Sequence, residues 1–340
     1  MVGGRVGNRR VVRRPYFFEI FIFVNLVVAV LVTRHLRPVV LTNIPTSFVE
    51  LLPQIVIPGV VGVAISLAVA AFRGKAASYL RVIRSRGWLV DTARMIIATI
   101  LTSHIYFWIK LLVPILHHRD FDQFFWNLDQ SLFFGFAPAL LFADLFSHPV
   151  AMRAIDWSYG RIFSYSFTLA FMYFLSAPSR RVRMAFMSGS AILWLAGAWL
   201  YLAVPTLGPA LRFPELWSAY ASSMPSTTYL QTMLMDNYRK VLLWQQGASV
   251  GVHSMLGVGA FPSLHVGFQT YVFLWMRRLW TFGEIVFGIF VVTILIGSVV
   301  TGWHYLIDGI AGAVLALLAY LVAARWWRTR EFFRLRGATR

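Results

Sequence analysis

The stretch FGEIVFGIFVVTILIGSVV, residues 282–300, decides the fold class of this chain. Apart from Glu284 it carries no charged residue, and a helix needs about 18 or more apolar residues in succession to cross a bilayer. Backbone polar groups cannot stay unpaired in lipid, so a run of this kind crosses as an α-helix. The stretch therefore predicts a transmembrane helix.

Further apolar runs lie on both sides of this stretch. Hydrophobic residues make up 59% of the 340-residue chain, against roughly 45–50% in soluble domains. We predict an all-α integral membrane protein, a polytopic helical bundle with eight spans. The other seven predicted spans are Tyr16–Thr33, Val49–Phe72, Met95–Leu116, Trp157–Leu175, Ala185–Val204, Ser263–Trp275 and Leu306–Ala324.

Two segments between the spans are long and more polar. Residues 119–146 have apolar residues at helical spacing with polar interruptions, which predicts one or two amphipathic helices at the membrane interface. Residues 205–260 mix prolines, glycines and serines, and form the largest segment outside the predicted membrane region.

The net charge of +18 could suggest nucleic-acid binding. The basic residues instead cluster in short segments between apolar runs, as membrane topology requires, and not on one soluble face. About two thirds of the 31 Lys and Arg residues fall on one side of an eight-span arrangement. We therefore expect both termini to be cytoplasmic and segment 205–260 to be extracytoplasmic, although Arg34 and Arg37 then lie on the outer side.

The lack of cysteine excludes several kinds of site, and the composition of the two ends indicates how they relate to the membrane. Without cysteine there is no disulfide, thiolate metal site or cysteine nucleophile. The basic segment 1–15 runs into a full-length apolar stretch without a small-residue cleavage pattern, so we expect a retained first helix. Residues 325–340 form a second basic tail.

Two short motifs flank the predicted spans Ser263–Trp275 and 282–300: FPSLH, residues 261–265, and GWHYLID, residues 302–308. Two crossings separate His265 from His304, so both histidines are expected at the same membrane face. If His304 and Asp308 lie on one helix, their spacing of four places them on one face. The carboxylate would then fix the imidazole tautomer and leave the other nitrogen free as a nucleophile or base.

The residues before His265 indicate a helix start. Pro262 suits a first turn, and Ser263 can cap free amides. A helix N-terminus offers N–H donors to a phosphate oxygen, so Ser263 is a candidate phosphate-binding residue. Three ionisable groups within spans favour a functional site. From the residues alone, phosphoryl or acyl chemistry, a metal site or proton relay, and simple packing all stay open.

The two motifs together resemble the type 2 phosphatidic acid phosphatase superfamily. The closer likeness is to its inositol phosphorylceramide synthase branch, whose motifs end in Ser-Leu-His and His-Tyr-x-x-Asp. The resemblance covers roughly residues 120–312, including DFDQFFWNLDQSLFFG and PTLGPALRFP.

The resemblance implies a fold and roles for several residues. It implies a six-helix catalytic core within residues 93–324, preceded by two added helices in residues 16–92. It implies His304 as the nucleophile, Asp308 as its orienting partner and His265 as the general acid, with no metal and no other cofactor. Arg212, in PTLGPALRFP, would lie near the lipid phosphate.

One departure from the family pattern concerns the counter-charge of the phosphate. Phosphatases of this superfamily carry a serine-arginine pair six or seven residues before the nucleophile, where this chain has Gly297 and Ser298. The synthase-like branch also tends to lack the arginine. The remaining candidates for binding the phosphate are Arg212, Ser263, Arg239 and Lys240.

These observations predict a membrane lipid phosphotransferase that works through a phosphohistidine, with an extracytoplasmic active site. Its partners would be a lipid phosphate donor, a lipid or water acceptor, and the bilayer, but no nucleic acid. The alternative is a hydrolase of lipid phosphates or polyprenyl diphosphates with the same site. A non-enzymatic alternative is a lipid transporter or scramblase, which would need a polar path through spans that are nearly all apolar.

Overall fold

The structure is a computed structural model that describes residues 15–36 and 43–326. Within these ranges all regular secondary structure is helical, which confirms the predicted all-α class. The two basic tails, apart from the residues next to the first and last helices, and Arg37 lie outside the described residues.

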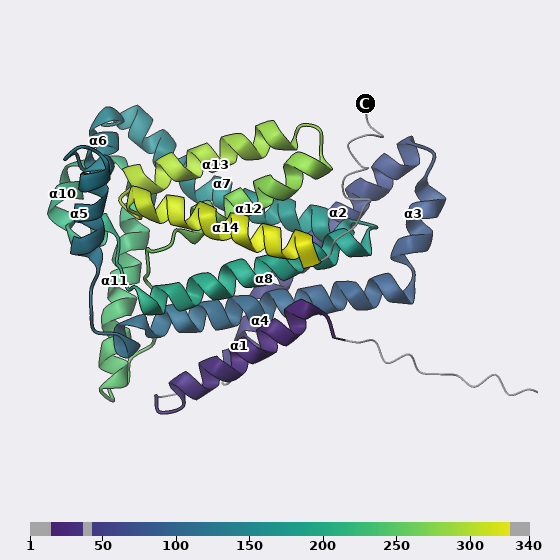
Figure 1. Ribbon diagram of the computed structural model, residues 1–340, viewed down its shortest axis with the longest axis horizontal. Helices are drawn as coiled ribbons and strands as arrows, with labels where there is room; N and C mark the ends of the chain where they lie inside the picture. The colour runs from purple at the N-terminus through teal and green to yellow at the C-terminus, as the bar shows by residue number, and fades with distance from the viewer. Residues whose placement is uncertain (1–14, 37–42, 327–340) are drawn as a thin grey trace, which may run out of the picture.

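Long helices occur at all eight predicted spans and lie roughly side by side in Figure 1. Five are long and apolar enough to cross a membrane, namely α2, α4, α8, α13 and α14, so the chain is a multi-pass integral membrane protein. Whether α1, α7 and α12 also cross stays a prediction. The bounds are α1 (Phe17–Thr33), α2 (Ile44–Phe72), α4 (Arg86–Leu116), α7 (Pro149–Ser176), α8 (Arg180–Ala203), α12 (Leu264–Leu279), α13 (Gly283–Val300) and α14 (Leu306–Trp326).

Six of these helices form the centre of the bundle. Helix α12 packs against α13 and α14, α8 against α4 and α14, and α7 against α13. Large apolar side chains such as Phe268, Tyr271 and Trp275 are fully buried between them. At Gly312 a Cβ atom would lie 2.1 Å from the carbonyl oxygen of Ser263, so only glycine lets α14 approach the start of α12 this closely. Helix α1 packs on α4 and α8, and α2 on α4 and α7.

Short helices cover one end of the bundle, on the left in Figure 1. The amphipathic segment 119–146 forms two of them, as predicted. Segment 205–260 contains the others, including a 21-residue helix that its mixed composition did not indicate. Its first amides, of Ser226 and Thr227, donate to the Asp156 carboxylate of α7. The helices are α5 (Asp122–Leu132), α6 (Pro138–Leu145), α9 (Pro209–Arg212), α10 (Pro214–Trp217), η2 (Ser218–Ser223) and α11 (Pro225–Gln245).

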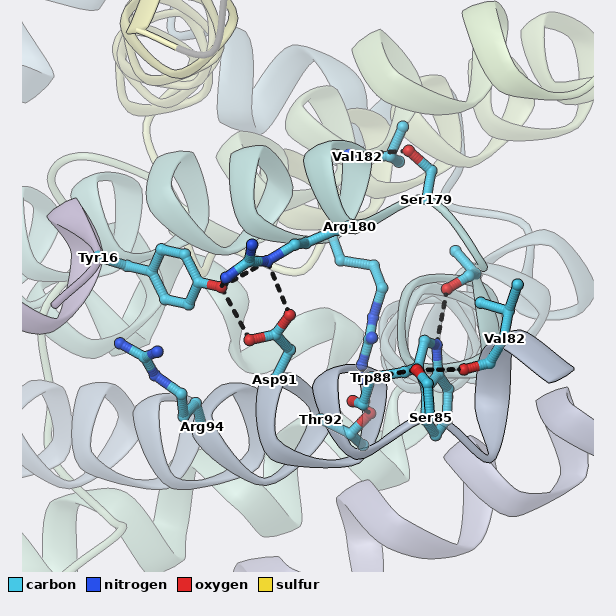
Figure 2. Close-up of polar contacts among 12 residues, drawn as sticks. Tyr16, Val82, Ser85, Trp88, Asp91, Thr92, Arg94, Ser179, Arg180 and Val182 are labelled. Atoms are coloured by element: carbon cyan, nitrogen blue, oxygen red, sulfur yellow. Dashed lines mark hydrogen bonds and ion pairs between the residues drawn. The ribbon is translucent and has the colours of Figure 1, made fainter. Parts of the chain in front are cut away.

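An ionic cluster around the buried Asp91 joins α1, α4 and α8 at the opposite end, near α3 (Ala76–Ile83) (Figure 2). The Tyr16 hydroxyl donates to Asp91 over 2.8 Å, and Arg180 forms an ion pair with the other oxygen of Asp91 at 2.9 Å. Asp91 is only 2% exposed. Since a buried carboxylate is costly without partners, these contacts hold the start of α1 against the core.

We expect Asp91→Ala to lower the stability of the protein by about 2 kcal/mol, because the Tyr16 hydroxyl and Arg180 lose their shared acceptor. The measurement is the Tm in detergent, which should fall by several degrees. Asp236→Ala is the matched control. It breaks the exposed Asp236–Lys240 pair, which is worth well under about 1 kcal/mol. Equal Tm values for the two variants would contradict this role of Asp91.

Candidate active site

The two motif histidines meet at the end of the bundle that the short helices cover. His265 is the second residue of α12, and His304 lies in the turn between α13 and α14. His265 Nδ1 is 3.4 Å from His304 Nε2. The predicted helix start is confirmed, because the Ser263 hydroxyl accepts a hydrogen bond from the Val266 amide. The chain thus brings together two residues that are 39 positions apart.

Asp308 lies beside the other nitrogen of His304. Its Oδ2 atom is 3.5 Å from His304 Nδ1, and both side chains are buried. This distance is too long for a firm hydrogen bond, and neither His304 Nδ1 nor Asp308 Oδ1 has a hydrogen-bond partner among the described residues. His304 Nε2, on the opposite edge of the ring, is the nitrogen nearer His265.

His304 and Asp308 do not lie on one helix, because α14 begins only at Leu306, so they are close without sharing a helix face. Gly302 has a φ of 70°, a left-handed conformation that ends the α13 helix and suits glycine. A Cβ atom there would lie 2.6 Å from the Trp217 ring. Asp308 reaches back to the turn instead: its Oδ2 accepts a hydrogen bond from the Tyr305 amide.

Asp129 of α5 holds the start of α14. Its two carboxylate oxygens accept hydrogen bonds from the Leu306 and Ile307 amides at 2.7 and 3.0 Å. These amides have no partner within their own helix, and the carboxylate also suits the positive end of the helix dipole. Burial raises the pKa of Asp129, and the two amides oppose that shift. Asp129 thereby fixes the turn that carries His304.

Asp122 lies on α5 two turns before Asp129. It connects the turn that carries His304 to the segment PTLGPALRFP. It is fully buried and accepts hydrogen bonds from the Leu207 and Gly208 amides and from the Tyr305 hydroxyl. Burial raises the pKa of Asp122 to about 6, and its backbone donors oppose that shift. Burial and the nearby Asp122 carboxylate also raise the pKa of Tyr305, so the hydroxyl stays protonated as a donor.

The segment 205–212 packs directly on the His304 turn. Gly208 has a φ of 96°, and a Cβ atom there would lie 2.3 Å from the Trp303 carbonyl oxygen. The Ala210 amide donates to the Gly302 carbonyl over 2.9 Å. The resemblance had placed this segment near the site, and in the structure it supports the turn through its backbone.

Lys110 of α4 is a cation that the sequence analysis did not select. It lines the same cavity as His265 and His304. The ammonium lies 5.1 Å from the Tyr201 ring centroid. Among the described residues it forms no ion pair with a carboxylate. Its position as the only charge within the predicted span Met95–Leu116 was a signal for function.

The four candidate phosphate-binding residues lie elsewhere. Arg212 forms an ion pair with Asp120 at 2.9 Å, and Lys240 with Asp236. Arg239 is exposed on α11, while Ser263 is fully buried with its hydroxyl engaged in the helix cap. None of the four lines the cavity that contains the histidines.

That cavity has a volume of about 880 Å³ and extends from the histidines into the bundle. It is large enough for a small-molecule or lipid ligand. Over the described part of the chain, no three His, Asp or Glu side chains converge in a way that could hold a metal ion. The cavity therefore presents the two imidazoles, the Lys110 ammonium and the Asp156 carboxylate, which the Ser226 and Thr227 amides occupy, while Asp308 lies behind His304.

Comparison with known proteins adds one finding. A family model described as the PAP2 superfamily matches residues 123–322, more than half of the chain, and this range contains both histidines and Asp308. No curated protein and no solved structure matches the chain.

Proposed function

This chain belongs to the PAP2 superfamily and is therefore a lipid phosphatase or phosphotransferase of the membrane; from that premise we propose that His304, His265 and Asp308 perform its phosphoryl transfer. The observation that carries the proposal is the contact between the two imidazoles, with a carboxylate at the far nitrogen of His304. Membership of an enzyme family also disfavours the transporter or scramblase alternative.

In the first step His304 Nε2 attacks the phosphorus of the donor lipid. The N–P bond forms as the ester P–O bond breaks, and His265 gives its proton to the departing alkoxide. Asp308 stabilises the positive charge that develops on the His304 ring and keeps Nδ1 protonated. The product is a phosphohistidine that carries the head group.

In the second step a hydroxyl group attacks the phosphohistidine. His265, now neutral, takes the hydroxyl proton, the new P–O bond forms, and the N–P bond breaks to restore His304. An oriented acid or base contributes roughly 10²–10⁴-fold to such steps. With a lipid alcohol as acceptor the enzyme is a transferase, and with water it is a phosphatase.

We favour the transferase, similar to inositol phosphorylceramide synthases. The support is the resemblance of the two motifs and the absence of an arginine at Gly297 or Ser298. The test is a product assay with phosphatidylinositol, phosphatidate and polyprenyl diphosphate, each with and without ceramide. Transferase activity requires a new phosphorylated lipid that depends on the acceptor. Free phosphate from phosphatidate or the diphosphate, unchanged by ceramide, would support the phosphatase.

Lys110 is our proposed counter-charge for the phosphate. It is the basic residue that lines the cavity together with both histidines, and a fixed cation stabilises the negative charge that phosphoryl transfer concentrates on the oxygens. Arg212 and Lys240 are already paired with carboxylates.

We expect Lys110→Met to lower kcat/KM by about 10²-fold, while Lys110→Arg keeps most of the activity, because only the first variant removes the charge. Lys240→Met is the control for loss of a lysine outside the cavity. Steady-state kinetics on the preferred donor lipid provide the measurement. Wild-type kcat/KM in the Lys110→Met enzyme would show that Lys110 is not the counter-charge of the phosphate.

The proposed orientation, with an extracytoplasmic site, can be tested on the natural cysteine-free background. Ser222 lies in η2 at the end with the histidines, and Ser179 lies in the exposed turn before α8. In intact cells we expect an impermeant thiol reagent to label Ser222→Cys directly and Ser179→Cys only after permeabilisation. Labelling of both from the same side contradicts the eight-span topology.

A further inference from the structure

The cavity at the histidines changes in character along its length. Near the site its lining is polar, with Lys110, His265, His304 and Thr227. Farther in, aromatic and aliphatic side chains predominate, with a few hydroxyl groups such as those of Ser103 and Thr99 among them. On α7 they recur every four residues along one face, at Tyr159, Phe163, Phe167, Phe171 and Leu175. A phosphate fits the first part, and a hydrocarbon chain fits the second.

Helix α4 gives the depth of the apolar part. Its cavity-lining residues run from Lys110 through Phe107, Ser103 and Thr99 to Met95. Fifteen residues of helix rise correspond to about 22 Å, most of the ~30 Å thickness of the hydrocarbon core of a bilayer. This depth accommodates a long extended chain.

Side chains from α4, α7 and α8 pack together at the deep end of the cavity. The Phe174 and Phe186 rings stack there with centroids 3.6 Å apart. Thr99 Oγ1 lies 3.6 Å from Met187 Sδ, which joins α4 to α8 at the same level. Met95 is 3% exposed and lines the cavity near these contacts. A chain that enters from the histidines therefore meets a floor.

Helix α2 forms a side wall, although it lies outside the residues matched by the family model. Near its start the Ser47 hydroxyl is 2.8 Å from His104 Nδ1 of α4. In its second half Ser66 bonds Ser176 of α7, and at Gly62 a Cβ atom would lie 2.0 Å from the Met172 carbonyl oxygen. Between these attachments, residues 51–58 border the cavity. Helix α2 is thus held against α4 and α7 on both sides of the stretch that borders the cavity.

We propose that this cavity holds one hydrocarbon chain of the phosphate-ester substrate, and that Met95, Thr99 and Met187 limit the length of that chain. The proposal rests on the proposed phosphoryl transfer, because it places the phosphate at the histidines. Lipid tails are as apolar as the cavity lining, so moving a chain from bilayer to cavity gains little. Selectivity then arises because a chain that is too long meets the floor and keeps its phosphate away from His304.

The test compares a variant that shortens the cavity with a matched control on the same helix. Thr99→Trp fills the deep end, whereas Ile97→Trp places the same side chain on the outer face of α4, where Ile97 is 46% exposed. The full chain in detergent is assayed on phosphatidates with short, medium and long acyl chains. A second arm uses polyprenyl diphosphates with few or many isoprene units, which distinguishes the two sources of chain.

We expect Thr99→Trp to lose at least about tenfold in kcat/KM on the longest chain that the wild type accepts. It should keep its activity on short chains, and Ile97→Trp should match the wild type throughout. Met95→Ala should shift the preference toward longer chains. The arm in which these shifts occur identifies the class of chain.

Two outcomes overturn the proposal: an unchanged chain-length profile in an active Thr99→Trp enzyme, or an unchanged profile in Met95→Ala. If Thr99→Trp is inactive on every chain, the Met95→Ala profile decides. Failure of the proposed function has a different signature, because the wild type would then turn over none of the phosphate esters, whatever their chain.

Discussion

His304→Ala should reduce turnover by at least about 10³-fold, because without the imidazole no nucleophile attacks phosphorus. Asp308→Asn should cost roughly 10²–10⁴-fold, since an amide neither fixes the tautomer of His304 nor stabilises its positive charge. Both residues are buried within one turn of chain, so the two losses should not add in the double variant. Initial rates on the preferred lipid provide the measurement.

His253→Ala is the matched control for the loss of an imidazole. His253 is exposed, its ring nitrogen accepts a hydrogen bond from the Met255 amide, and it does not line the cavity that contains the histidine pair. This variant should retain wild-type activity and Tm. A folded His304→Ala enzyme with near-normal turnover would reject the proposed nucleophile.

His265→Ala should be nearly inactive on natural lipids but should recover its first step on a substrate with a phenol-type leaving group. A lipid alkoxide leaves poorly without a proton, whereas a phenolate needs little help, so the value of the acid falls as the leaving group becomes more acidic. The measurement is the burst of phenol on mixing. Its amplitude should equal the enzyme concentration, because the second step still lacks its base.

His304→Ala serves as the control in the same experiment and should give no burst with either substrate. If the activated substrate brings no advantage to His265→Ala, then His265 acts chiefly as a phosphate ligand. His265, 3.4 Å from His304, would then position the phosphoryl group and would not give a proton to the leaving group.

The position of both histidines at one end of the bundle could be predicted from the sequence, because it depends only on the number of membrane crossings between them. Two apolar runs separate His265 from His304, and two crossings return the chain to the same end of the bundle. The capped start of α12 was also predictable, since Ser263 supplies a local signal. The ends of the two helices around His304 were also predicted, because the predicted spans end at Val300 and begin at Leu306 as α13 and α14 do. The left-handed backbone of Gly302 in the turn between them was not predicted.

The supports of the site depend on contacts between distant segments, which one sequence does not reveal. Asp122 and Asp129 are seven residues apart and hold two different segments by their backbone amides. In the sequence they looked like polar interruptions of an amphipathic helix. Lys110 was visible as an isolated charge in a predicted span, but only the fold places it in the cavity with His265 and His304.

The central claim is that His304 becomes phosphorylated during turnover, and trapping that intermediate tests it most directly. His265→Ala is mixed with an activated lipid substrate labelled in its phosphate, quenched, digested, and the label is mapped. The mechanism predicts one acid-labile phosphate per enzyme on the peptide that contains His304, and none in the His265→Ala/His304→Ala double variant. Label on another residue, or phenol release without any protein-bound phosphate, would contradict it.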